Sequence, residues 1–97
     1  MERQEFAALY EHLRSSLFAY AAARLPAQSA LDVVHDTFEV VWAKRDEAPD
    51  DPEQRIAWSF GIARNKVRQE LQRVRRKHHD NRFIEAVVDL IGPADGA

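Results

Sequence analysis

The sequence of 97 residues contains no cysteine, only three glycines, and no apolar run near the ~18 residues that a membrane span needs. Without cysteine, disulfides and thiol chemistry are excluded, which suits a reducing compartment, so a cytoplasmic location is expected. The first residues, "MERQEFAALY", lack the basic stretch and apolar core of a secretory signal. The alternating apolar pattern typical of strands is also missing, so an all-α fold is predicted.

Apolar residues make up 45% of the chain, including five Phe and two Trp, which indicates a folded domain. The length fits one small domain. Helical periodicity runs from Arg3 to Leu25 and from Ser29 to about Glu47, and a third helix follows Asp51. A shorter helical pattern spans Asp80 to Ile91. The predicted fold is therefore a compact bundle of three main helices, with a short fourth helix after them.

Local signals predict where these helices begin and end. Pro26 should end the first helix. Ser29, with Asp32 three residues later, resembles a capping box and predicts that the second helix begins there. Asp51 before Pro52 predicts the start of the third helix. The core stripe of that third helix consists of Ile56, Phe60, Ala63, Val67, Leu71 and Val74.

Charge is unevenly distributed along the chain, although the net charge is only −2. Residues 1–54 hold five basic and eleven acidic side chains, whereas residues 55–77 hold eight basic side chains and one acidic one. Lys and Arg near a helix C-terminus also complement the helix dipole, but the run "RVRRKHH" is too dense for that purpose alone. The segregation predicts two partners of opposite charge.

The third helix carries a second face outside its core stripe. An aromatic ring there can stack on a base, an amide can contact base edges, and cations can neutralise phosphates. Gly61 would let another backbone approach. This composition predicts nucleic-acid binding, but Trp58 would also fit a second core stripe, and both interpretations stay open. The candidate DNA-binding residues are Arg55, Trp58, Ile62, Asn65, Lys66, Gln69, Arg73, Arg75 and Arg76.

The second helix also has a second face, which is acidic and partly apolar. It is flanked by Leu31 and Trp42 and fits docking onto a basic partner helix. An ordinary solvated acidic face is the alternative, and the pattern alone favours it. Its residues are Asp32, His35, Asp36, Glu39 and Ala43.

Three stretches, "LYEHLRSSLFAYAAARL", "LDVVHDTFEVVWAK" and "IAWSFGIARNKVRQELQRVRRK", together resemble the second domain of bacterial sigma factors of the extracytoplasmic-function (ECF) group. The resemblance covers about Phe6 to Lys77. It implies a sigma region 2 domain over residues 1–78, with residues 79–97 beginning an interdomain linker or forming a short helix. Ser59 departs from the family pattern, because an apolar residue is more usual there and its loss would loosen packing. The helix-turn-helix domain that reads the minus-35 element is also missing, so either an excised domain or an unusually short protein is expected.

The resemblance also implies roles for individual residues. The second helix would dock on the clamp coiled coil of core RNA polymerase through Leu31, Asp32, His35, Asp36 and Trp42. The third would bind the promoter minus-ten element during strand opening through Trp58, Ile62, Asn65, Lys66 and Gln69. The loop from Ala48 to Arg55 would capture a base flipped from the non-template strand, with Pro49, Asp50 and Asp51 shaping the pocket. An anti-sigma factor is a further expected partner.

Two other functions compete with this one: a stand-alone helical DNA-binding module, and a protein-interaction bundle that binds no DNA. An enzyme is not expected. His12, His35, His78 and His79 form no metal-like grouping with carboxylates, and no Gly-rich phosphate loop or nucleophile constellation is present. No metal or cofactor is therefore expected.

Overall fold

Three α-helices form the bundle, as predicted. The computed structural model describes residues 1–80, with side chains described as far as Arg76. The order is α1 (Arg3–Ala22), α2 (Ala27–Ala43), the short 3-10 helix η1 (Arg45–Glu47) and α3 (Pro52–Asp80). Residues 1–80 contain no strand, which confirms the all-α prediction. The fourth helix predicted from Asp80 to Ile91 lies outside the described residues.

The start of α3 follows its sequence signal. Pro52 is the first helical residue, and the Gln54 N–H donates a hydrogen bond of 2.9 Å to the Asp51 carboxylate. This contact satisfies one of the backbone donors that a helix N-terminus leaves unpaired.

The boundaries around Pro26 differ from the prediction. Helix α1 ends at Ala22 rather than Leu25, because proline disfavours helical geometry in the residue before it. Helix α2 begins at Ala27, two residues before the predicted start at Ser29, with Pro26 in an extended conformation immediately before it. The predicted capping box is therefore wrong.

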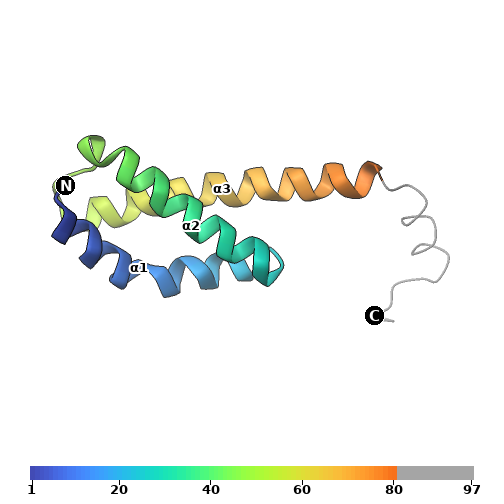
Figure 1. Cartoon of the computed structure of the whole chain (residues 1–97), viewed down its shortest axis with the longest axis horizontal. Coiled ribbons are helices and arrows are strands. Elements are labelled where there is room, and N and C mark those ends of the chain that lie inside the picture. The colour runs from blue at the N-terminus through green and yellow to red at the C-terminus, as the bar shows by residue number, and fades with distance from the viewer. Residues whose placement is uncertain (81–97) are drawn as a thin grey trace.

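Helices α1 and α2 run antiparallel and pack together against the N-terminal part of α3, whose last turns project beyond them (Figure 1). With 29 residues, α3 is about 43 Å long at 1.5 Å per residue. None of the helices within residues 1–80 has the length and apolar character needed to cross a membrane. The projecting end of α3 carries the arginine run.

The core consists of two adjoining clusters of buried apolar side chains. One joins all three helices at the N-terminal end of α3, and the other lies nearer the α1–α2 turn. Their members are Leu9, Leu13, Leu17, Phe38, Val41 and Ala63 in the first, and Ala21, Leu25, Ala30, Val33 and Val67 in the second.

Two polar residues are fully buried, Thr37 on α2 and Ser59 on α3. The Thr37 hydroxyl donates to the Val33 carbonyl at 2.7 Å, and the Ser59 hydroxyl donates to the Arg55 carbonyl at 2.9 Å. No buried side-chain polar atom within the described residues lacks a hydrogen-bond partner. Ser59 is therefore buried without leaving its hydroxyl unpaired, which would cost ~1–3 kcal/mol.

Candidate functional site

The predicted docking face of α2 is exposed to solvent. Asp32, His35 and Asp36 are all exposed, and Leu31, at 53% exposure, is one of the most exposed large apolar residues. His35 lies 3.6 Å from the Glu39 carboxylate, an exposed contact one helical turn away. An accessible acidic stripe with an exposed leucine is suited to contact a basic, partly apolar surface.

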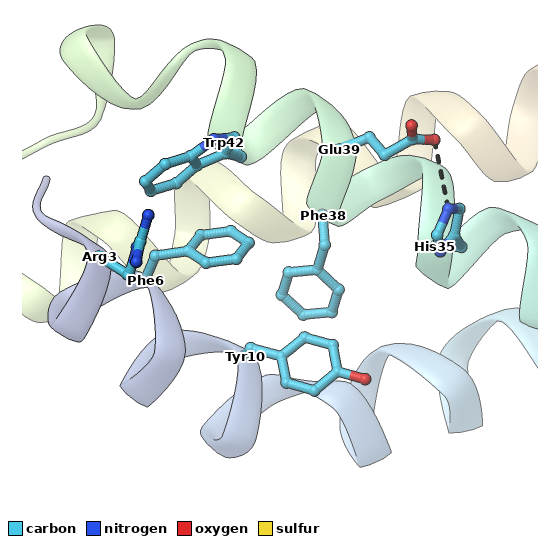
Figure 2. A pocket seen from close by; sticks show the side chains of 7 residues that line it. All are labelled: Arg3, Phe6, Tyr10, His35, Phe38, Glu39 and Trp42. Atoms are coloured by element: carbon cyan, nitrogen blue, oxygen red, sulfur yellow. Dashed lines mark ion pairs between the residues drawn. The ribbon is translucent and has the colours of Figure 1, made fainter.

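Beside this stripe, aromatic side chains of α1 and α2 line a groove of about 490 Å³, here called the aromatic groove (Figure 2). Phe6 and Trp42 lie 5.0 Å apart between ring centroids, and Tyr10 and Phe38 lie 4.8 Å apart. Polar side chains also line the groove: Arg3, His35 and Glu39. Aromatic residues in a concave surface are typical of interaction hot spots.

Most of this groove could not be predicted from the sequence. Helical spacing places Phe6 and Tyr10 on the apolar face of the first helix, yet Tyr10 is 39% exposed. The missing signal was the partner across the groove. The relevant rings of α1 and α2 face each other only once the two helices pack, and helical spacing alone cannot reveal this.

The predicted nucleic-acid face of α3 divides into two parts. Trp58 and Ile62 are half-buried and pack against the first core cluster, whereas Asn65 and Gln69 are exposed. The core interpretation of Trp58 therefore holds for part of the ring, and its contact with DNA stays a prediction. Arg73, Arg75 and Arg76, farther along α3, are exposed.

Part of the acidic stripe and part of the basic face share one groove between α2 and α3, about 440 Å³ in volume and here called the polar groove. Lys66, Gln69 and Arg73 of α3 line it opposite Asp32 and Asp36 of α2. From the sequence alone, the acidic stripe of α2 and the basic face of α3 were predicted as separate surfaces. Their proximity means that carboxylates lie within the field of the cations predicted to bind phosphate.

Within the polar groove, Glu70 and Arg73 form a hydrogen-bonded ion pair on the surface of α3. The hydrogen bond from Arg73 lowers the pKa of Glu70, and the same contact raises the pKa of Arg73. Because the guanidinium already has an anionic partner, a phosphate would have to compete with Glu70 for it. Arg75 and Arg76 make no ion pair within the described side chains.

The loop residues predicted to shape a base pocket, Pro49, Asp50 and Asp51, lie between η1 and α3. Asp50 and Asp51 are exposed, and Pro49 is half-buried. The guanidinium of Arg55, a predicted DNA-binding residue, contacts three protein acceptors: the Pro49 carbonyl at 3.0 Å, the Asp50 carbonyl at 3.4 Å and the Glu5 carboxylate at 3.3 Å. Its contact with DNA stays a prediction.

Another groove, between α1 and α3, was not identified from the sequence. Tyr20, Phe60, Gly61 and Arg64 line it, with a volume of about 300 Å³ and no acidic residue in its lining. A Cβ built on Gly61 would meet nothing within 4 Å, so Gly61 does not serve a close internal contact. The signal available in the sequence was Arg64 one helical turn after Phe60.

The Glu5 carboxylate has a lowered pKa, because it accepts a hydrogen bond from the Glu2 N–H and lies beside Arg55. A lowered folded-state pKa adds stability above the ordinary value of 4.5, and this contribution is lost as the pH falls through the folded value. We expect Glu5→Gln to be less stable than the wild type at pH 6–7, and the two to converge as the pH falls through the lowered folded-state pKa of Glu5. Thermal melts of both proteins across this range measure the difference, and a gap that persists at low pH would contradict this assignment.

No group of three or more His, Asp or Glu side chains within the described residues could hold a metal ion. The surfaces described above are grooves and charged faces, which suit contact with macromolecules. A comparison with protein families indicates which macromolecules these surfaces bind. The model for sigma-70 region 2 matches residues 9–77.

This chain belongs to the sigma-70 region 2 family. The match covers most of α1, all of α2 and nearly all of α3. Sigma region 2 acts in transcription, where it takes part in promoter recognition and binds RNA polymerase, and it is not an enzyme. No curated protein and no solved structure gives a significant match to the chain.

Proposed function

We propose that this sigma region 2 domain is of the extracytoplasmic-function type, docks on the clamp coiled coil of core RNA polymerase, and recognises and melts the promoter minus-ten element. The observation that carries the proposal is the opposite charge of two accessible surfaces. The exposed face of α2 presents Asp32 and Asp36, and the projecting part of α3 presents Arg75 and Arg76.

The polymerase contact is proposed for Leu31, Asp32, His35, Asp36 and Trp42. The structure supports it in one further respect, because Trp42 and His35 also line the aromatic groove. A partner helix with basic and apolar side chains could pair with the carboxylates and cover the exposed Tyr10 ring and the accessible part of Trp42 at once. The same groove would suit an anti-sigma factor that competes with polymerase.

For DNA, we propose that the exposed amides of Asn65 and Gln69 contact base edges, while Lys66, Arg75 and Arg76 contact phosphates. Trp58 and Ile62 support this face from a half-buried position. The loop of Pro49, Asp50 and Asp51 receives the flipped base.

A pull-down with purified core RNA polymerase tests the proposal. We expect the wild-type chain to bind core, and the double variant Asp32→Lys, Asp36→Lys to lose most of that binding. An interaction bundle with an unrelated partner is the competing function, and the aromatic groove is what favours it. That alternative predicts that core is not retained and that single-stranded DNA shows no salt-dependent binding. The sigma function predicts that core is retained and that single-stranded DNA binds in a salt-dependent manner.

A further inference from the structure

Arg55 differs from the other arginines of α3 in how completely its charge is satisfied within the protein. Its side chain is only 11% exposed, whereas that of Arg73 is 61% exposed. Three acceptors surround the guanidinium: the carbonyl oxygens of Pro49 and Asp50, and the Glu5 carboxylate fifty residues earlier in the chain. Such a charge is stable in a sheltered position because its donors are paired.

The loop that Arg55 contacts has little else to hold its backbone. Pro49 has no N–H to donate, and within the described residues no backbone–backbone hydrogen bond involves Pro49 or Asp50. The Arg55 Cα, by contrast, is fixed in the first turn of α3, where its N–H bonds to the Asp51 carbonyl at 2.9 Å. The guanidinium therefore connects the first turn of α3 to a segment whose backbone, within residues 1–80, is held by no backbone–backbone hydrogen bond at Pro49 or Asp50.

Glu5 connects this arrangement to α1. One carboxylate oxygen accepts the Glu2 N–H at 2.9 Å, and the other lies 3.3 Å from the Arg55 guanidinium. The hydrogen bond within the first turn of α1 thus holds the carboxylate in place beside Arg55. Two helices and the loop meet at one side chain.

We propose that Arg55 is a positioning residue that pins the Pro49–Asp50 backbone against α1 and so preforms the loop that receives the flipped base. The inference rests on the proposed function of that loop. A loop already held in its binding shape loses less conformational entropy when the base enters, so pinning should strengthen base capture. Arginine suits this role because its planar fork reaches several acceptors, whereas lysine offers a single point charge.

The test uses Arg55→Met and Arg55→Lys, with Arg14→Met as the matched control. Arg14 pairs with Glu11 at 3.5 Å on the exposed surface of α1 and is not part of the loop network. The backbone order parameter of the Asp50 amide is measured by NMR on the full chain. We expect values near ~0.85 in the wild type and Arg14→Met, and values below ~0.6 in both Arg55 variants. Equal order parameters in all four proteins would overturn the proposal that Arg55 pins the loop.

The second measurement separates the pin from the loop's function. The same proteins, bound to core RNA polymerase, are titrated with single-stranded minus-ten oligonucleotides that carry either a base or an abasic site at the flipped position. We expect the preference for the base to fall roughly tenfold in the Arg55 variants and not in Arg14→Met, on the scale of the hydrogen bonds lost. A drop in order parameter with an unchanged preference would overturn the link between pinning and base capture, whereas equal binding of the base-carrying and abasic strands by the wild type would reject base capture by the loop itself.

Discussion

Replacing Asp36 by arginine is expected to weaken binding to core RNA polymerase by about 100-fold, because like charges brought together at an interface cost several kcal/mol. Asp36 is exposed and forms no ion pair within the described side chains. The fold should therefore survive the change. Titration of labelled chain with core polymerase measures the affinity, and circular dichroism checks the helix content.

Glu11→Arg provides the matched control for Asp36→Arg. It makes the same change of charge at an exposed position of α1, where Glu11 pairs only with Arg14. We expect its affinity for core to stay within about twofold of the wild type, in line with the small effects of exposed ion pairs. If both variants weaken binding equally, the effect comes from net charge and not from the α2 face.

Truncating Trp58 to alanine is expected to destabilise the domain by about 2–3 kcal/mol, below the ~3–5 kcal/mol typical of a fully buried ring. The ring is half-buried and packs against the first core cluster. For a domain of this size, such a loss lowers the melting temperature by roughly 10 °C or more. Differential scanning calorimetry of the variant measures the shift.

Two further variants separate stability from DNA recognition at this face. Trp58→Phe keeps most of the packing and should cost less than ~1.5 kcal/mol of stability. Asn65→Ala removes an exposed amide, so it should leave the melting temperature unchanged and reduce the preference among minus-ten sequences. If Trp58→Ala melts like the wild type but loses single-strand binding, the ring serves DNA alone.

Much of the fold could be predicted from local patterns. Asp51 and Pro52 marked the start of α3 because a cap followed by proline satisfies the first turn by itself, without help from distant residues. Ala63 and Val67 of the predicted α3 stripe are buried. The predicted start of α2 at Ser29 was wrong. Ser29 and Asp32 matched a capping pattern, but the extended Pro26 already allowed the helix to begin at Ala27.

The candidate site was harder to predict because it depends on contacts between helices. Helical periodicity gives the direction of a side chain, but not what lies across from it. Arg55 was grouped with the DNA-binding cations because it is basic and lies about one helical turn before Trp58, yet its acceptors are Glu5 and the loop carbonyls. Likewise, nothing in the sequence places Asp36 and Lys66 in one groove.

That shared groove has a consequence for how the two partners act together. Asp32 and Asp36, proposed to face polymerase, lie opposite Lys66 and Arg73. In the free domain these carboxylates reduce the positive potential available to phosphate. A basic polymerase helix that neutralises them would leave the cations of α3 more attractive to DNA. Strong DNA binding is therefore expected only in the polymerase complex.

The most direct test of a polymerase-dependent role in promoter opening is fluorescence anisotropy of a labelled minus-ten non-template strand, titrated with the chain in the presence and absence of core RNA polymerase. Each titration is repeated at several salt concentrations, with the matching duplex in parallel. We predict weak binding of both DNAs by the chain alone, and tight, sequence-dependent binding of the single strand when core is present. Tight, sequence-specific binding of the duplex by the chain without polymerase would contradict the account.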